Sequence, residues 1–286
     1  MKRRIVAAYG DTHGAHRLGL LNPAVELLDQ DEAGNPRVWT PTPTATQRWL
    51  WDWFGKDVAS VMELAQGDDV VVIHTGDCTS GRKYPEGLIS TRDLDQFAIA
   101  VANMAPWLEH DNVTTIRLVH GTQSHEFSQG TAPDLVAGQL GILHPARSIK
   151  ATRHGLFVVD GVRFDCAHHG PTAGIRRWTA GNQLRLYTRS LIQDSRDRGI
   201  EPPDVVLRAH YHTYCREVII WTHDQSRQTE AVITPAYCGL SHYTVQATRS
   251  AYLTSCGMVA FVIEDGRLVE THAFTRAVDL RTEEVL

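Results

Sequence analysis

The chain has 286 residues, of which 42% are hydrophobic and 21% charged, and its formal net charge is −5. This composition is typical of a folded globular protein, and its mild acidity argues against a protein that binds nucleic acid or membranes through charge alone. The length suits one large α/β domain, so we expect a single domain over 1–286. Fifteen histidines stand against four methionines. Histidine is the commonest metal ligand and acid–base residue, so the positions of these histidines come first.

The five cysteines are widely spaced and include no Cys-x-x-Cys pair. Their odd number and wide spacing predict reduced thiols. They argue against a disulfide framework or a thiolate zinc site. The apolar stretch Ile5–Tyr9 ends after five residues, too short for the core of a signal peptide. No apolar run approaches the roughly 18 to 20 residues that cross a bilayer. We therefore expect a cytoplasmic protein without a membrane partner.

Short apolar runs rich in β-branched residues alternate with segments of helical period. In chain order, the sequence predicts a strand at 5–9, a loop over 29–36 and 41–44, a helix at 46–65, a strand at 70–74, a helix at 93–108, a strand at 113–119, a helix at 133–140, strands at 156–159 and 162–166, a helix at 178–198, and strands at 205–207, 217–221, 231–234 and 258–263. In the first helix, Trp49, Trp53, Val61 and Leu64 would form the packing face.

Two dipeptides, Asp160-Gly161 and Asp265-Gly266, follow apolar runs and are typical of two-residue hairpin turns. The later part of the chain should therefore contain antiparallel pairs. Alternating strands and helices followed by hairpins predict an α/β protein with one mixed sheet or two.

Five predicted strands are followed directly by carboxylates or imidazoles. These residues are Asp11 and His13, Asp77, His125 with Glu126, His168 with His169, and His210 with His212. Sites in α/β sheets assemble at the carboxyl ends of the strands. Residues i and i+2 leaving a strand point to the same side, so we expect Asp11 with His13, and His210 with His212, to converge.

Carboxylates and imidazoles without thiolates are the ligand set of catalytic centres for borderline or hard divalent metals. Two such ions, bridged by a carboxylate, suit phosphoryl chemistry. One ion lowers the pKa of the nucleophilic water, and both neutralise charge on the phosphate oxygens.

The order of these motifs resembles the calcineurin-like metallophosphoesterase superfamily, with Asp-x-His, Gly-Asp, a Gly…His-Glu segment, a His before Gly, and x-His-x-His spread over 11–212, about 70% of the chain. Segments 18–23 and 47–53 also resemble a phage or prophage branch of that family. The resemblance implies an α/β fold of two mixed β-sheets packed face to face and flanked by helices, a four-layer sandwich.

The resemblance also implies roles for individual residues. Asp11, His13 and His212 would hold a first metal ion, Asp77 would bridge both ions, and His168 and His210 would hold the second. His125 would contact the phosphate and protonate the leaving oxygen. The ions would be two divalent metals drawn from Mn, Zn, Fe or Ni.

The sequence departs from the family pattern at the asparagine that normally ligates the second metal. Counting from the strand end places Thr122 there, the amide chemistry favours Gln123, and counting back from His125 selects Ser124; we choose Thr122. Ala209 replaces a glycine. Either His168 or His169 could be the ligand of the fourth motif, and because adjacent strand residues face opposite ways, we expect only one, His168, to bind.

Three further histidines, His16, His74 and His120, adjoin the motifs and could orient the metal ligands, but we expect them to be individually satisfied by hydrogen bonds. Arginines over 176–198 either track a nucleic-acid backbone or form a solvated helix face, and the acidic residues among them favour the second.

We therefore predict a metal-dependent phosphoesterase that hydrolyses phosphomonoesters or phosphodiesters through a metal-activated water. Its partner is a phosphate-ester substrate, and a nucleotide or nucleic acid is the first subclass to test. The alternative is a catalytically degenerate phosphoesterase fold that serves as a protein-binding scaffold, motivated by the missing asparagine.

Overall fold

The computed structural model describes residues 3–30, 32–127, 131–174, 177–222, 227–240, 253–279, 281 and 284. The strands are β1 (Arg3–Tyr9), β2 (Leu27–Gln30), β3 (Pro36–Trp39), β4 (Asp69–His74), β5 (Val113–Val119), β6 (Ser148–Thr152), β7 (His154–Val159), β8 (Val162–Ala167), β9 (Val205–Arg208), β10 (Cys215–Ile220), β11 (Gln228–Ile233), β12 (Leu253–Glu264) and β13 (Arg267–Asp279). The α-helices are α1 (Ala45–Ala65), α2 (Asp93–Ala102), α3 (Ala105–Leu108), α4 (Ala132–Leu143) and α5 (Asn182–Asp197), with 3₁₀ turns η1 (Pro85–Gly87), η2 (Gln123–His125) and η3 (Arg177–Thr179).

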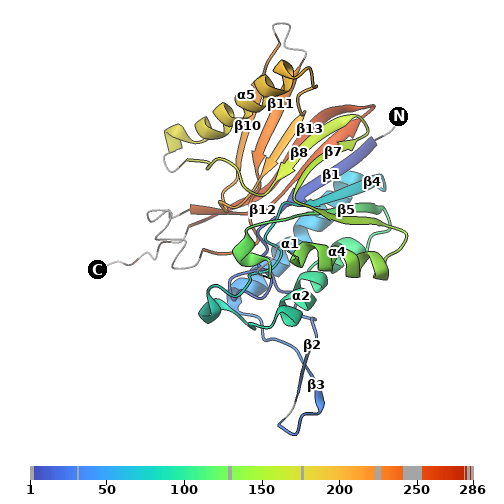
Figure 1. The fold of residues 1–286 in the computed structure, drawn as a ribbon, viewed down its shortest axis with the longest axis vertical. Helices are drawn as coiled ribbons and strands as arrows, with labels where there is room; N and C mark the ends of the chain where they lie inside the picture. The colour runs from blue at the N-terminus through green and yellow to red at the C-terminus, as the bar shows by residue number, and fades with distance from the viewer. Residues whose placement is uncertain are drawn as a thin grey trace.

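Two larger sheets carry the fold (Figure 1). The six-stranded sheet has the order β13-β12-β1-β4-β5-β6, in which β1, β4, β5 and β6 are parallel and β12 and β13 antiparallel. The five-stranded sheet has the order β10-β11-β9-β8-β7, parallel at its centre and antiparallel at both edges. Both sheets are therefore mixed, as predicted.

The two sheets pack face to face through one apolar core. Val6 and Ala8 of β1 contribute to it together with Phe164, Leu207 and Phe261 from other strands. The alternate residues of β1 are buried on the opposite face, against the helices. Burial on both faces explains why β1 is a continuous apolar run.

Helices cover the outer face of each sheet. On the six-stranded sheet, α1 buries Leu50, Phe54 and Val61, and α4 packs against β5 and β6. On the five-stranded sheet, α5 buries Leu184 and Ile192. The result is the predicted order of helix, sheet, sheet and helix layers.

The packing face predicted for α1 was wrong at its tryptophans. Trp49 is 39% exposed, whereas Leu50, one residue later, is buried. Trp53 is half-buried, and the Arg276 guanidinium lies 3.7 Å from the centre of its ring.

Capping sets the start of α1, because Thr44 and Gln47 form a reciprocal capping box.

Other expectations needed correction. The loop predicted over 29–36 contains the turn of a hairpin, β2 with β3, which projects away from the sheets (Figure 1). The helix predicted over 93–108 is two helices, because the chain leaves α2 at Asn103, whose side-chain amide donates to Leu20 O. β6 and β13 were not predicted. Both Asp-Gly turns occur where expected, joining β7 to β8 and β12 to β13.

Among the described residues, no helix has the combined length and apolarity that a membrane crossing requires.

Candidate metal centre

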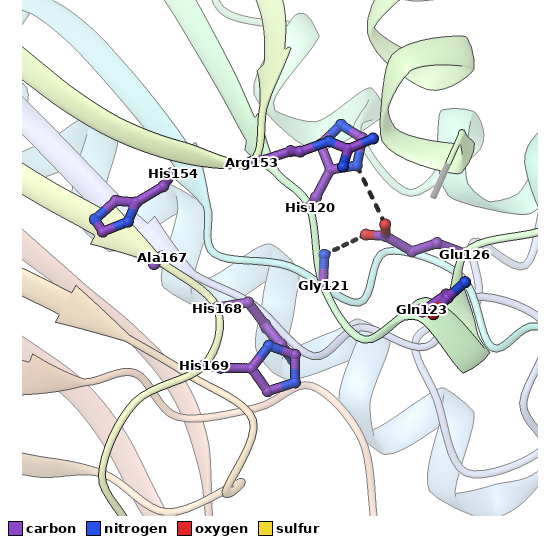
Figure 2. A pocket seen from close by; sticks show the side chains of 9 residues that line it. All are labelled: His120, Gly121, Gln123, Glu126, Arg153, His154, Ala167, His168 and His169. Atoms are coloured by element: carbon purple, nitrogen blue, oxygen red, sulfur yellow. Dashed lines mark hydrogen bonds and ion pairs between the residues drawn. The ribbon is translucent and has the colours of Figure 1, made fainter. Parts of the chain in front are cut away.

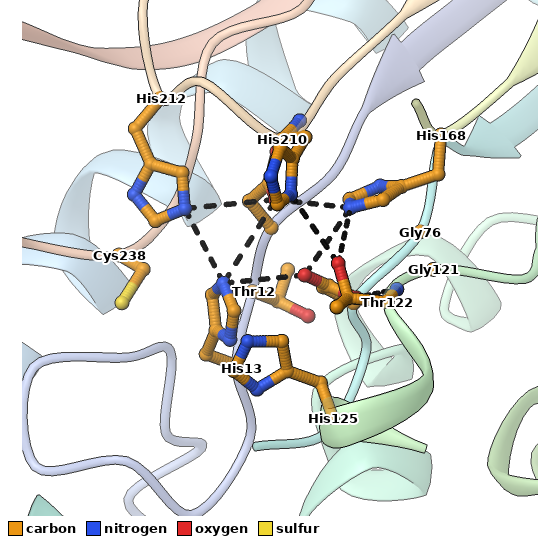
Figure 3. Close-up of polar contacts among 12 residues, drawn as sticks. Thr12, His13, Gly76, Gly121, Thr122, His125, His168, His210, His212 and Cys238 are labelled. Carbon is orange, nitrogen blue, oxygen red and sulfur yellow. Dashed lines mark hydrogen bonds and ion pairs between the residues drawn. The ribbon is translucent and has the colours of Figure 1, made fainter. Parts of the chain in front are cut away.

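The carboxyl ends of β1, β4, β5, β8 and β9 lie together and bring the predicted site residues to one place (Figure 3). The residues predicted from the sequence are Asp11, His13, Asp77, Thr122, His125, His168, His210 and His212, and all eight belong to this cluster. Five of them are nearly inaccessible, at 0% for Asp11, 7% for His13, 1% for Asp77, 1% for His168 and 9% for His212.

The first predicted metal position lies between Asp11, His13 and His212. Asp11 Oδ1 is 3.6 Å from His212 Nε2 and 3.8 Å from His13 Nε2. The two imidazole nitrogens are 3.3 Å apart. Asp77 Oδ2 is also 3.8 Å from His13 Nε2. These ligand-type atoms surround a point that one ion could occupy.

The second predicted position lies on the other side of Asp77. Its Oδ2 is 3.2 Å from His168 Nε2, so this oxygen adjoins both positions, as a bridging role requires. Thr122 Oγ1 lies 3.4 Å from His168 Nε2 and 3.3 Å from His210 Nδ1. Thr122 therefore places its hydroxyl where we expected it, whereas Gln123 lines a neighbouring cavity (Figure 2).

The backbone reason for this convergence differs from the predicted one. Asp11, His13, Asp77, His210 and His212 all have positive φ, between 42° and 77°. They account for half of the non-glycine residues with positive φ in the described part of the chain. β1 ends at Tyr9 and β9 at Arg208, so alternation along a strand does not apply to these residues. Left-handed loop backbone, strained for side-chain-bearing residues, turns the ligands inward.

Backbone hydrogen bonds between the ligand loops hold this conformation. The Asp11 amide donates to Gly76 O at 2.9 Å, and the His13 amide donates to Asp77 O at 2.9 Å. The loops after β1 and β4 thus stay paired beyond the ends of their strands.

Four of the site side chains use one atom for orientation and present the other to the cluster. Asp77 Oδ1 accepts from the Thr122 amide at 2.6 Å, and Asp11 Oδ2 accepts from the His210 amide at 3.0 Å. His168 Nδ1 lies 3.0 Å from Thr75 O, and His125 Nδ1 lies 2.7 Å from Ser80 O. A carbonyl only accepts, so both Nδ1 atoms carry the proton and both Nε2 atoms face the cluster.

Two glycines make room for these side chains. A Cβ at Gly76 would lie 2.3 Å from His168 Nδ1, and one at Gly121 would lie 2.0 Å from Asp77 Oδ1. No larger residue fits at either position without moving a predicted ligand.

Electrostatics favour ionised carboxylates and mostly neutral imidazoles. Burial alone would raise the pKa of Asp77, but His168 and other imidazoles hold it well below its ordinary value. Asp11 behaves in the same way, with His212 the strongest of the lowering groups. Burial lowers the pKa of His210 to about 4. Burial also opposes the charge on His168, yet Asp77 and Asp11 raise its pKa to about 9.

One buried carboxylate oxygen of Asp11 indicates that the cluster suits a cation. Asp11 Oδ1 is inaccessible and has no hydrogen-bond partner among the described residues. An unsatisfied buried charge is costly, by about 1–3 kcal/mol or more, and a divalent ion would remove that cost. The donor set of carboxylate oxygens and imidazole nitrogens also suits Zn, Fe, Ni or Mn. The residues therefore fit a metal centre.

His125 lies at the edge of the first position. Its ring stacks edge-on against His13, with 4.7 Å between ring centres, and its ligand-type nitrogen falls within 4.8 Å of those of His13 and Asp77. It is half-buried and therefore open to a substrate on one side.

Sequence reasoning missed the role of Glu126, which is 1% exposed. Its carboxylate accepts from the Gly121 amide and lies 3.3 Å from His120 Nδ1 (Figure 2). Glu126 thereby fixes the loop that carries Thr122. The signal was its place directly after His125. His120 and His74 are hydrogen-bonded as expected, His74 Nε2 lying 3.0 Å from Thr12 Oγ1.

The site opens onto a cavity of about 420 Å³, here called the lateral cavity. It is lined by His120, Gly121, Gln123, Glu126, Arg153, His154, Ala167, His168 and His169 (Figure 2). Within the arginine segment, Arg185 pairs with Glu217 at 2.8 Å, which fits the helix-face interpretation at that residue.

Comparison with known proteins gives structural neighbours at low similarity. No family model matches the chain, and no curated protein matches it. One neighbour is a conserved uncharacterised protein of Streptococcus pneumoniae TIGR4 described as a predicted phosphoesterase, with 10% identity, a TM-score of 0.36 and coverage of 98% of this chain and 99% of that one. Another is wild-type Vps29 of Entamoeba histolytica complexed with Zn²⁺, with 11% identity, a TM-score of 0.38 and coverage of 97% and 99%. Likeness at this level carries no argument, so the family resemblance rests on the ordered motifs.

Proposed function

We propose that this protein is a dinuclear metal-dependent phosphoesterase that hydrolyses phosphate esters. The observation that carries the proposal is the arrangement of Asp11 and Asp77. Both carboxylates are buried. In each, one oxygen accepts a hydrogen bond from a backbone amide and the other oxygen faces imidazoles. A scaffold has no use for two buried carboxylates that converge on four imidazoles in strained loops.

Asp11, His13 and His212 would hold one divalent ion, His168, His210 and Thr122 the other, and Asp77 would bridge them. When bound, the ions would lower the pKa of a nucleophilic water and neutralise charge on the phosphate oxygens. The protein's own contribution is orientation, because the Thr122 and His210 amides fix the two carboxylates before any substrate arrives.

His125 would protonate the leaving group. With its Nδ1 proton engaged by Ser80 O, a second proton can sit only at Nε2, on the side facing His13 and the cluster. From Nε2, His125 would donate that proton to the ester oxygen as the P–O bond breaks.

The lateral cavity would receive the anionic substrate. Arg153, His154 and His120 lie on its wall, and Arg153 has no hydrogen bond or ion pair within the described ranges. A free guanidinium near a phosphate site favours an additional phosphate or carboxylate on the substrate. Nucleotides and nucleic-acid ends meet that description, and monoester or diester preference is decided by assay.

The test uses protein stripped with chelator and refilled with Mn²⁺, Zn²⁺ or Ni²⁺. Refilled protein should cleave p-nitrophenyl phosphate or bis(p-nitrophenyl) phosphate. Asp77→Asn should lower kcat about 10³-fold, the loss of about 4 kcal/mol of transition-state stabilisation. The control is Asp93→Asn, which changes the same side chain at an exposed ion pair with Arg82.

Two results would reject the proposal. Bound metal without turnover of either ester class would show that the cluster is not hydrolytic. No bound metal at all would favour the scaffold alternative.

A further inference from the structure

His169 makes contacts that neither the strand pattern nor the family resemblance predicts. β8 ends at Ala167, so His168 and His169 follow the strand and are not bound by its alternation. Their ring centres are 4.8 Å apart, and His169 is also 4.7 Å from the ring centre of His210. The ligand-type nitrogens of His168, His169 and His210 all lie within 4.8 Å of one another.

The three imidazoles converge on the hydroxyl of Thr122. Thr122 Oγ1 lies 3.4 Å from His168 Nε2, 3.2 Å from His169 Nε2 and 3.3 Å from His210 Nδ1. A threonine hydroxyl has one proton and two lone pairs, so it can bond all three nitrogens only when two of them carry a proton. A metal ion would instead use the lone pairs of all three nitrogens at the same place.

The contact between His168 and Asp77 also favours a cation at this place. Its Nδ1 proton is engaged by Thr75 O, so in the neutral ring Nε2 carries a lone pair, and that atom lies 3.2 Å from the acceptor Asp77 Oδ2. Something positive must therefore lie between the two atoms: a proton on Nε2 does so in the imidazolium, and a bound cation would take its place. A cation among His168, His169, His210 and Asp77 satisfies every one of these atoms.

We propose that His169, in place of Thr122, is a ligand of the second metal ion and takes the coordination place left by the missing asparagine. The second position then has three imidazoles and the bridging carboxylate of Asp77, whereas the first has two imidazoles and two carboxylates. Borderline ions such as Zn²⁺, Co²⁺ and Ni²⁺ favour imidazole, while Mn²⁺ and Mg²⁺ favour oxygen. The second position therefore selects the borderline ions.

This ligand assignment rests on one part of the proposed function, namely that the site binds metal ions. It does not depend on hydrolysis. It is tested on the metal-free full chain by calorimetric titration with Zn²⁺ and by the visible absorption of bound Co²⁺, neither of which needs turnover. Wild type should take up two ions per chain. His169→Ala should keep one ion at wild-type affinity and weaken the other by about 100-fold or more, because even partners that only orient ligands change affinity 10- to 100-fold.

His154→Ala is the matched control, since His154 lines the same cavity but pairs with Asp165 at 3.1 Å, away from the cluster. It should bind two ions as wild type does. His169→Asp should restore the second ion and shift its preference from Zn²⁺ toward Mn²⁺. His169 is exposed, so these variants should fold, and circular dichroism checks that they do.

The outcomes separate the two proposals. Two ions bound by His169→Ala with unchanged affinity and Co²⁺ spectrum overturn the assignment, even if that variant has a raised KM. The expected binding pattern without hydrolysis by any form leaves the assignment standing and rejects the phosphoesterase function. Wild type that binds no ion overturns both.

Discussion

Gly121→Ala is the sharpest perturbation of the site, because it adds one methyl group and removes no ligand. The new Cβ would lie 2.0 Å from Asp77 Oδ1 and 2.3 Å from the Asp77 amide nitrogen, where real contacts stay beyond 3.0 Å. The carboxylate and its loop must therefore move by about 1 Å. That movement also breaks the hydrogen bond from the Thr122 amide, which is 2.6 Å long.

The expected magnitude follows from this displacement. A misplacement of about 1 Å in a catalytic group costs about 10²-fold in rate, or about 2.7 kcal/mol. Loss of the Thr122 amide as an orienting partner should weaken metal binding by about 10- to 100-fold. Overpacking should lower the free energy of unfolding by about 1–3 kcal/mol.

The assay is kcat for bis(p-nitrophenyl) phosphate at saturating metal, with metal affinity from calorimetry and unfolding by urea. Gly138→Ala is the control, since Gly138 lies in α4 with no atom within 4 Å of its added Cβ. That variant should keep full activity and gain about 0.5–1 kcal/mol of stability. If Gly121→Ala folds and keeps wild-type kcat and metal affinity, the bridging role of Asp77 is wrong.

Three further variants test separate parts of the reasoning. His125→Ala should lower kcat about 10²- to 10⁴-fold for esters with poor alkoxide leaving groups, but much less for p-nitrophenyl esters, whose leaving group needs no proton; equal losses for both classes would contradict the general-acid role. Arg276→Met should cost about 3–5 kcal/mol in urea unfolding because it leaves the Asp57 carboxylate buried without its ion pair, whereas Arg82→Met, at an exposed pair, should cost less than about 1 kcal/mol. Burial raises the pKa of Asp204, so its stabilising contribution is present below its ordinary pKa and is lost as pH rises through the raised value. Asp204→Asn keeps an oxygen to accept from the Arg163 amide and should therefore raise the melting temperature at pH 7 but not at pH 3; a lower melting temperature at pH 7 would show that its charge is stabilising.

The sequence was most informative where burial is greatest. β1 and β4 are buried on both faces, so their residues are continuously apolar and their ends are marked by the first polar residue. Those ends supplied Asp11 and Asp77. The order of motifs along the chain then carried the family resemblance, which no single motif could do.

Elements at the sheet edges were predicted poorly. β13 pairs on one side only, and its residues alternate between half-buried and exposed, with Glu270 and Arg276 among them. β6 is the opposite edge and is similarly polar. An edge strand needs no continuous apolar run, so its sequence carries little signal. The α1 packing face failed for a related reason, because helical period alone leaves the face uncertain by one residue, which separates Trp49 from Leu50.

Within the site, the sequence predicted which residues would cluster but not their backbone conformation. Asp11 and His13 converge as expected, but strand alternation is not the cause. Both residues lie beyond β1 and have positive φ. The same error made His168 and His169 look mutually exclusive. Once the chain has left the strand, alternation no longer forbids both imidazoles from facing Thr122.

Five left-handed non-glycine residues in one site cost about 1–3 kcal/mol each, a sum comparable to the whole stability of a domain. Contacts with the rest of the fold must hold these residues in place. The Asp11 and His13 amides donate to Gly76 O and Asp77 O, and the His210 amide donates to Asp11 Oδ2, so each ligand loop is held by another. The strands beneath these loops are fixed in turn by the core between the sheets. The strain is therefore supported by the fold, because each loop of the site is held by a neighbouring loop and by the strands beneath it.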